Sequence, residues 1–307
     1  MTGQIKVSLH VPMHERVLEC IKCPSQSTLY DELVDALDGG DATWLNQFTA
    51  GFREAVYVYM MRHGLMRRLL ANSVCNQGQS PRIPIRNRSS SIAITQRTQG
   101  SFNILPSSPQ RWCTPAETHF LDRHSFKYIG APNVIYQEFS SAIRRLMTQG
   151  EQKTMFNMAR QLVPVHKVSN FDLTTFDNLV QHMTSKGTKV CYAVVGFYAW
   201  TQLKGYLKPT ELNPNPLDPI CVADRNGVAI LSENSYPWLN FGARSCTVGN
   251  NEFFLFTDAL NVGAYTDRDG ISTHTFTGDA GLCSSITTTS ISIALTNELG
   301  IERGEII

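Results

Sequence analysis

The chain has 307 residues, of which 42% are hydrophobic, and its formal net charge is +1 at pH 7. This composition is near the globular average, so the chain can bury a sizeable core. No apolar run reaches the ~20 residues that a membrane-spanning helix needs, and the first residues lack the pattern of a secretory signal. We therefore expect neither a membrane partner nor export.

Eight cysteines are scattered along the chain. Without an export signal, this distribution predicts reduced thiols rather than a disulfide framework. Cys20 and Cys23 have the spacing of a metal-ligand pair, but a zinc site of this type needs a second pair nearby. The sequence has no such pair, so we expect no metal site and no cofactor.

Charge is distributed unevenly. Residues 1–54 hold 4 basic and 8 acidic side chains, residues 55–167 hold 15 and 4, and residues 168–307 hold 8 and 14. Eight arginines, and no acid or lysine, lie between Glu54 and Glu117. Arginine pairs bidentately with carboxylate or phosphate. The basic segment therefore fits nucleic acid or the acidic surface of another copy of the chain, and a solvated face without a partner is the third interpretation.

The first 116 residues are predicted to pass from helix to hairpin. Apolar side chains at helical spacing predict helices over 28–38 and about 42–62. Gly64 should interrupt the second helix before a short basic helical turn. Between 76 and 116, the runs IAIT and SFNIL flank a polar turn. They predict an extended hairpin, which needs another surface to lie on because two strands alone are marginally stable in water.

The rest of the chain mixes helix and strand. Residues 133–163 give the strongest helical pattern, with Gly150 as the place for a kink or split and Pro164 as the end. A helix–strand–helix unit follows over 172–208. Short strands then alternate with turns to the C-terminus. DRDG, at 267–270, resembles the start of a calcium loop but lacks its later ligands, so we predict a turn there.

Motifs for catalysis are absent from the sequence. It contains no phosphate-binding loop, no dinucleotide fingerprint and no nucleophile elbow. We therefore expect no enzyme activity. An enzyme built on the helix–strand–helix unit is an alternative that no motif supports.

The order of elements resembles a tailed-phage major capsid protein with the HK97-type fold. Two stretches carry the likeness. NLVQHMTSKGTKVCYAVVGFYAWTQLKGYLK is similar to the helix, strand and short helix of that family's axial domain, and ISIALTNELGIERGEII is similar to its closing strand and tail.

The resemblance implies an α+β architecture of four parts. These are a helical N-terminal arm (1–75), an extended E-loop hairpin (76–130), a peripheral domain with a long spine helix and a sheet (131–167 and 251–307), and an α/β axial domain (168–250). It implies a structural protein of the virion, made in the host cytoplasm, whose pentamers and hexamers form an icosahedral shell around double-stranded DNA. Portal, scaffolding or decoration proteins are further implied partners.

The resemblance also assigns candidate contact residues. In such shells the E-loop lies across an adjacent subunit, so the arginines of the hairpin, Arg82, Arg86, Arg88 and Arg97, are expected to pair with carboxylates of that neighbour. Basic residues of the spine helix, Arg144, Arg145, Lys153 and Arg160, are expected to face packaged DNA through weak contacts without sequence preference.

Some relatives join subunits covalently through a lysine in the E-loop. No lysine lies between Lys22 and Lys127, so we expect non-covalent contacts here. Two alternatives remain open: an encapsulin-like shell around an enzyme cargo, and a basic nucleic-acid-binding protein.

Overall fold

The structure is a computed structural model. It describes residues 11–23, 26–73, 83–84, 93–96, 102–105, 112–113, 117–126, 143, 145–212, 218, 220–233, 247–278 and 282–307. The chain divides into two compact units, one made of residues 1–58, 122–142 and 271–287 and the other of the remainder. No helix in the described ranges is long and apolar enough to cross a membrane.

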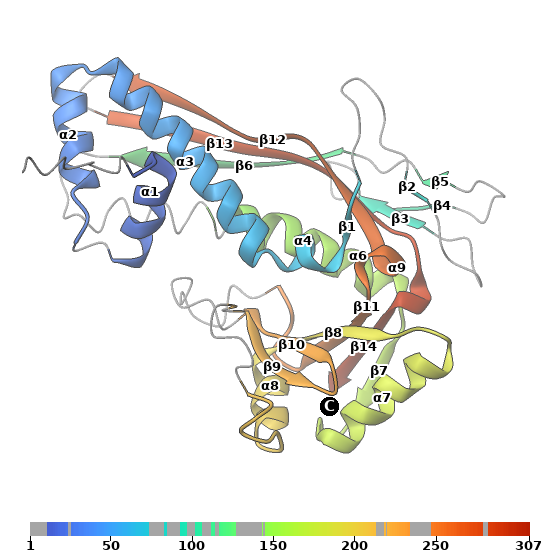
Figure 1. The fold of residues 1–307 in the computed structure, drawn as a ribbon. Helices are drawn as coiled ribbons and strands as arrows, with labels where there is room; N and C mark the ends of the chain where they lie inside the picture. Colours follow the sequence, from blue (N-terminus) through green and yellow to red (C-terminus); the bar gives the residue numbers. More distant parts are fainter. Residues whose placement is uncertain are drawn as a thin grey trace, which may run out of the picture. The chain divides into compact units, whose positions relative to one another are not determined.

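The first unit holds the N-terminal helices α1 (Met13–Lys22), α2 (Leu29–Gly39) and most of α3 (Ala42–His63) (Figure 1). The two helices predicted at 28–38 and 42–62 are confirmed as α2 and α3, whereas α1 was not predicted. An ion pair of 2.5 Å between Arg16 Nη2 and Glu32 Oε1 links α1 to α2. The buried side chains of these helices include Val17, Ile21, Leu29, Leu33, Phe48 and Phe52.

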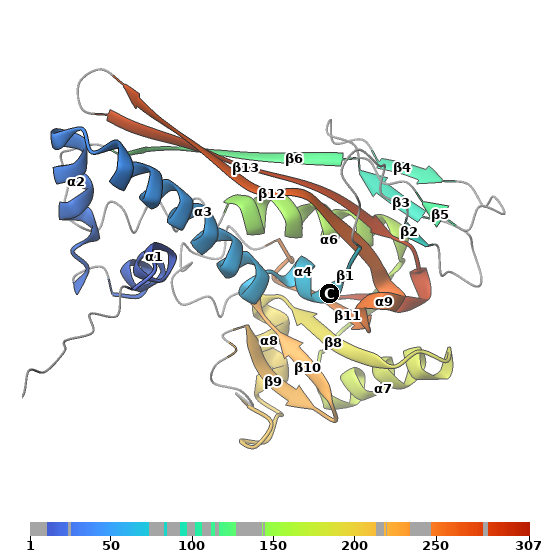
Figure 2. The same cartoon turned by 45° about the horizontal axis from the view of Figure 1, so that its top comes forward.

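One sheet of the described chain has the strand order β1-β12-β13-β3-β4, with β6 also paired to β13 (Figure 2). The bounds are β1 (Ala71–Asn72), β3 (Ala93–Gln96), β4 (Phe102–Leu105), β6 (Glu117–Phe126), β12 (Gly263–Gly278) and β13 (Leu282–Leu295). The β-type alternation near the C-terminus predicted β13. The turn predicted over 267–270 is wrong, because β12 runs straight through it.

The second unit also contains a sheet with the order β7-β14-β11-β8-β10-β9. The bounds are β7 (Val165–Val168), β8 (Val190–Val195), β9 (Cys221–Arg225), β10 (Val228–Leu231), β11 (Glu252–Thr257) and β14 (Ile301–Ile306). Asn226 and Gly227, with φ of 54° and 79°, form the two-residue turn between β9 and β10. Asn-Gly favours this hairpin geometry because both residues tolerate positive φ.

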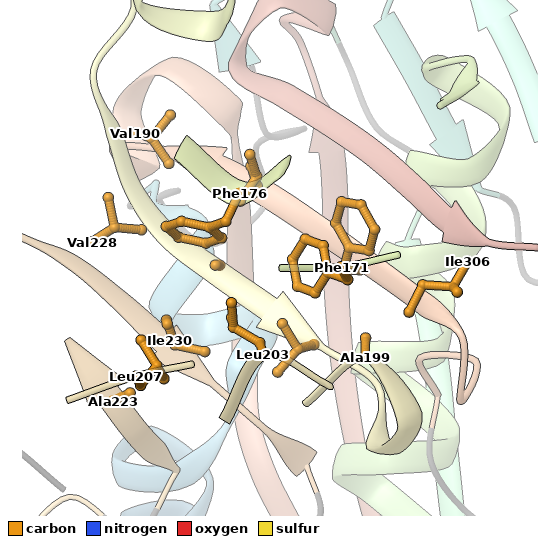
Figure 3. Close-up of a cluster of buried hydrophobic side chains, with 14 of the residues drawn as sticks. Phe171, Phe176, Val190, Ala199, Leu203, Leu207, Ala223, Val228, Ile230 and Ile306 are labelled. Carbon is orange, nitrogen blue, oxygen red and sulfur yellow. The ribbon is translucent and has the colours of Figure 1, made fainter. Parts of the chain in front are cut away.

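Helices cover both faces of this second sheet. On β11, Phe253 and Leu255 belong to the cluster that includes α7 (Leu173–Ser185) and α8 (Phe197–Lys204) (Figure 3). Successive strand residues point to opposite faces, so Phe254 and Phe256 face the other way. Both pack against the ring of Phe156 on α6 (Lys153–Leu162), at centroid distances of 5.1 and 6.3 Å. The layers are helix, sheet, helix. The predicted helix–strand–helix unit is confirmed, because α7, β8 and α8 follow one another along the chain.

The predicted spine helix is confirmed over 145–162, as a wider π-helical segment η2 (Arg145–Gln152) that continues into α6. Residues 133–142 lie outside the described part. Gly150 lies within η2, where an added Cβ would lie 2.9 Å from the ring of Phe120. The glycine therefore gives the aromatic ring of β6 room to pack against the helix.

The predicted four-domain division stays a prediction. The strands β11 and β14, assigned to the peripheral domain, lie in the same sheet as β8, β9 and β10, assigned to the axial domain.

Candidate assembly surfaces and ion-pair clusters

Two antiparallel strand pairs form within the predicted arginine-rich hairpin, residues 76–116. Strands β3 and β4 pair antiparallel, with Ala93 opposite Leu105 and Gln96 opposite Phe102. Further out in sequence, β2 (Ile83–Pro84) pairs antiparallel with β5 (Trp112–Cys113). The predicted hairpin is thus confirmed.

The hairpin is joined to the rest of its own chain through β3. Thr95 and Ile94 pair with Ala294 and Leu295 of β13. The hairpin was expected to lie on another surface. At the β3 edge of the hairpin, that surface is the sheet that contains β13. Arg82 directly precedes β2 and Arg97 directly follows β3, while all four candidate arginines, Arg82, Arg86, Arg88 and Arg97, lie outside the described residues.

The four candidate DNA-facing residues are not brought into one cluster among the described residues. Arg144 lies outside the described part, and Arg145 is the first residue of η2. Lys153 is exposed at the start of α6. Arg160, two turns further along, is engaged within the chain.

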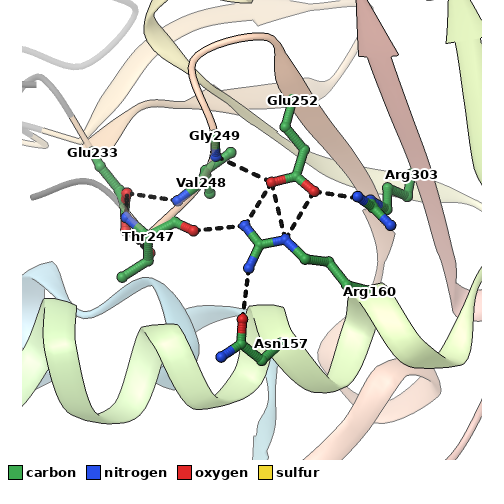
Figure 4. A network of polar contacts seen from close by, with 8 residues as sticks. All are labelled: Asn157, Arg160, Glu233, Thr247, Val248, Gly249, Glu252 and Arg303. Carbon is green, nitrogen blue, oxygen red and sulfur yellow. Dashed lines mark hydrogen bonds and ion pairs between the residues drawn. The ribbon is translucent and has the colours of Figure 1, made fainter. Parts of the chain in front are cut away.

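Arg160 lies at the centre of what we call the Glu252 cluster, formed by Arg160, Glu252 and Arg303 (Figure 4). The Arg160 guanidinium donates to both carboxylate oxygens of Glu252, at 2.9 Å from Nε and 2.6 Å from Nη2. It also donates to Asn157 Oδ1 and to the carbonyl oxygen of Thr247. From β14, Arg303 Nε donates to Glu252 at 2.8 Å. The cluster ties α6 to β11 and β14.

Two neighbouring carboxylates in Figure 4 have opposite electrostatic environments. Burial opposes ionisation of Glu252, but hydrogen bonds from Arg160 and Gly249 and the charges of Arg160 and Arg303 outweigh it, so its pKa lies below the ordinary value. Burial raises the pKa of Glu233, and hydrogen bonds from Thr247 and Val248 and the charge of Arg160 do not cancel this effect. The direct ion pairs with Arg160 and Arg303 therefore distinguish Glu252 from Glu233.

A second buried cluster joins Arg67 of α4 (Leu65–Leu69) to Glu151 and Asp267. Arg67 donates to Glu151 Oε1 at 2.6 Å and to Asp267 Oδ2 at 2.9 Å, and the side chains of Arg67 and Glu151 are each 1% exposed. Burial opposes the charge on Arg67, but the two carboxylates outweigh it and raise its pKa. Burial raises the pKa of Glu151, and the charge of Asp267 adds to this while Arg67 opposes it.

Sequence reasoning missed both clusters. The paired members lie between 51 positions apart, for Arg303 with Glu252, and 200 positions apart, for Arg67 with Asp267. A usable signal was the single acid Glu252 at the start of the apolar run FFLF. A charge in a buried strand needs a partner.

The Cys20–Cys23 pair does not assemble a metal site with other described residues. Cys20 is buried and Cys23 exposed, both with free thiols. Burial raises the pKa of Cys20. In the described ranges, no group of three His, Cys, Asp or Glu side chains is placed to hold a metal ion.

No family model matches the sequence, and no curated protein matches it. Solved structures match its fold. The chain in the crystal structure of a virus-like particle from Pyrococcus furiosus is similar with a TM-score of 0.51 and 11% identity, over 84% of this chain and 99% of that chain. The capsid of cyanophage P-SCSP1u gives 0.44 and 10%, over 80% and 89%. An encapsulin complex from Synechococcus elongatus gives 0.44 and 10%, over 78% and 85%.

The likeness to the chain of the virus-like particle, together with the paired hairpin, the spine helix and the helix-covered sheet, defines the fold class. The chain is α+β and has the HK97-type fold.

Proposed function

We propose that this chain is the subunit of a self-assembling protein shell, and specifically the major capsid protein of a tailed phage. The observation that carries the proposal is the likeness to a chain that forms a virus-like particle, which extends over 99% of that chain. A fold by itself does not define a function, so the arginine-rich hairpin is the second support.

In the proposed shell, the hairpin of one subunit lies on an acidic surface of the next. Residues 81–102 contain four arginines and no lysine or acid. Acidic side chains suitable for a partner surface are exposed on and just after α2, at Asp31, Asp35, Asp38 and Asp41. Each exposed pair would contribute only ~0.5–1 kcal/mol, but the contact repeats in every subunit of the shell.

The proposed cargo is double-stranded DNA. Lys153 is exposed at the start of α6 and is available to a phosphate backbone. Arg160 would contribute through the field of the Glu252 cluster rather than by direct contact, since its guanidinium holds Glu252, Asn157 and Thr247. Such contacts are independent of sequence and weaken with salt.

Expression of the chain alone, followed by negative-stain microscopy and light scattering, tests the shell. We expect closed particles of uniform size. A protein that stays a single compact molecule at high concentration would overturn the proposal.

The contents of the particles separate the two kinds of shell. Nuclease-resistant double-stranded DNA in particles from infected or lysogenic cells supports the capsid. Particles without DNA that retain one specific protein support the encapsulin-like alternative, which shares the fold.

The basic segment between Glu54 and Glu117 favours a second candidate, a nucleic-acid-binding protein. It predicts that the isolated subunit shifts a DNA duplex in a gel, with affinity falling steeply as salt rises. The shell proposal predicts assembly instead.

A further inference from the structure

Two histidines and a lysine surround the buried carboxylate of Glu302 on β14. Nε2 of His166, from β7, lies 2.5 Å from Glu302 Oε1, and Nδ1 of His182, from α7, lies 3.3 Å from the same oxygen. Lys186, the residue after α7, donates from Nζ to the other oxygen, Oε2, at 3.3 Å. The Glu302 side chain is only 4% exposed. We call these four residues the Glu302 cluster.

The second sheet and α7 bring these groups together. β7 and β14 run parallel, with His166 opposite Gly304. Because successive side chains along a strand alternate between faces, His166 and Glu302 point to the same face of the sheet as Ile306. Ile306 belongs to the buried core that also contains Phe176 of α7. The Glu302 cluster therefore joins α7 to the edge of the sheet that β7 and β14 form (Figure 1).

One oxygen of this carboxylate has no hydrogen-bond donor. Glu302 Oε1 is buried and accepts no hydrogen bond from the described residues, although two imidazole nitrogens lie at ion-pair distance from it. What His166 and His182 can give this oxygen is positive charge, and an imidazole carries that charge only when it is protonated. A buried carboxylate without a compensating charge or donor is unfavourable, so the state of the histidines determines how well Glu302 is tolerated.

Both rings can exchange protons with solvent. His166 is 42% exposed and His182 is 46% exposed. A cavity of about 170 Å³ also opens beside His166 and Glu302. The imidazoles can therefore gain or lose a proton without the unfolding of the elements that carry them, while the carboxylate between them stays buried.

The other groups around Glu302 do not replace this charge. Lys186 reaches only Oε2, and a lysine keeps its charge well above neutral pH. Glu298, in the turn before β14, lines the same cavity and adds negative charge. Leu255 of β11, the strand partner of Glu302, is uncharged. Near neutral pH, the variable part of the charge beside Glu302 is therefore that of His166 and His182.

We propose that the Glu302 cluster is a pH-sensitive latch, which fastens α7 to the β7–β14 edge when His166 and His182 are protonated and loosens it as the pH rises towards neutral. Free carboxyl groups lose their proton above about pH 4.3, and free imidazoles lose theirs above about pH 6.5. The ion pairs therefore form between these two values, and their stabilisation is lost as the imidazoles deprotonate. The latch lies within one chain and does not depend on the proposed function.

Thermal unfolding tests the latch. The full chain and the variant H166Q/H182Q are compared at pH 5.5 and pH 7.5, with EDTA present so that no metal ion can take the place of the protons. The melting temperature of the parent should exceed that of the variant by about 2–4 °C at pH 5.5, and the difference should largely vanish at pH 7.5. Both proteins contain Glu233 and Glu151, so the pH dependence of those groups cancels. A difference that is the same at both pH values would overturn the inference.

A control variant excludes a general effect of removing histidine. His119 on β6 is exposed, and no ion pair joins it to the other described residues. H119Q should therefore follow the parent at both pH values. If H119Q lost the same acid stabilisation as H166Q/H182Q, the proposed latch would be wrong.

Glu302→Gln tests whether the histidines act through this carboxylate. In the E302Q background, the further substitutions H166Q and H182Q should no longer change the difference in melting temperature between pH 5.5 and pH 7.5. A pH-dependent effect of the histidines that persists in E302Q would overturn the inference, because they would then act through another group.

Hydrogen–deuterium exchange measures the latch in the parent chain and needs no variant to fold. Protection factors, which correct for the intrinsic exchange rate at each pH, should be several-fold higher at pH 5.5 than at pH 7.5 for the backbone amides of residues 182–186. The internal reference is α8, which packs on the same core and should keep its protection. Unchanged protection at the end of α7, or an equal change in α8, would contradict the latch.

Discussion

Arg160 on α6 holds both carboxylate oxygens of Glu252 on β11, 92 positions further along the chain. The Glu252 side chain is 7% exposed and Arg160 is 25% exposed. This pair fastens the spine helix to the middle of the second sheet. Since the sheet strands come from widely separated segments, the contact determines how those segments are held together rather than how any one of them folds.

Arg160→Met should therefore destabilise the subunit. Loss of the Arg160 guanidinium leaves Glu252 paired with one arginine, Arg303, instead of two. We therefore expect a loss of about 3 kcal/mol in the free energy of unfolding, the lower end for a broken buried pair. The measurement is urea unfolding. Lys153→Met, on the same helix but exposed, is the control and should change stability by less than about 0.5 kcal/mol. Equal effects of the two substitutions would contradict the assignment.

Glu252→Gln and Glu233→Gln should change the pH dependence of stability in opposite directions. The folded-state pKa of Glu252 is lowered from 4.5, so its stabilisation is complete above that value and is lost as pH falls through the lowered pKa. The folded-state pKa of Glu233 is raised from 4.5, so its contribution is present below that value and is lost as pH rises through the raised pKa.

The expected result is that E252Q removes part of the loss on the acid side, while E233Q reduces the decline in stability as pH rises above about 4.5. Unfolding curves collected from acid to neutral pH measure both. Burial also raises the pKa of Glu151. The E233Q variant should therefore keep part of the decline in stability with rising pH. If stability depended on pH in the same way in E252Q and E233Q, the opposite pKa shifts of Glu252 and Glu233 would be ruled out.

Arg67→Met should cost about 3–5 kcal/mol, because it leaves Glu151 and Asp267 buried without their shared cation. Arg67→Lys should recover little, since an ammonium group cannot make the bidentate contact. The adjacent Arg68→Met is a matched control: Arg68 pairs with Asp218 while 25% exposed, and its loss should cost about 1 kcal/mol or less. Thermal and urea unfolding of the three variants measure these losses in the free energy of unfolding. A loss in R67M no larger than in R68M would show that the Arg67 cluster does not stabilise the fold.

Charge reversal in the hairpin should block assembly without unfolding the subunit. The double variant R86E/R88E replaces two positive charges with two negative ones. The hairpin would then repel the proposed acidic surface of the neighbour. We expect soluble subunits and no closed particles by negative-stain microscopy. The double variant K22E/K189E makes the same change at exposed lysines elsewhere and should assemble. Normal particles from R86E/R88E would defeat the proposed hairpin contact.

Much of the local structure followed from the sequence. Periodic apolar residues predicted α2, α3, α7 and α8, and the paired β-like runs predicted the hairpin of β3 and β4. Gly187, with a φ of 80°, lies just after α7, where glycine is favoured because it tolerates the left-handed conformation. These features depend on contacts between residues a few positions apart, or on the conformational freedom of one residue, so a local pattern contains the necessary information.

Other elements were missed where the local signal was weak or conflicted with the tertiary arrangement. The Asn-Gly turn that pairs β9 with β10 was a usable hairpin signal that the sequence reading overlooked. The motif at 267–270 favoured a turn locally, but β12 passes through it between β1 and β13, and Asp267 of this strand pairs with Arg67. A charged residue with a buried partner does not need solvent.

The sequence by itself determined much of the secondary structure, the uneven distribution of charge and the order of elements that resembles the HK97-type fold. Only the tertiary structure decided that Arg160 binds Glu252, that two carboxylates share Arg67, and that Phe197 and Tyr198 of α8 stay exposed. Periodicity describes neighbours along the chain, whereas these contacts depend on which distant segments the sheet brings together. Burial and the proximity of charge are properties of that packing, so they become visible only when the chain is folded.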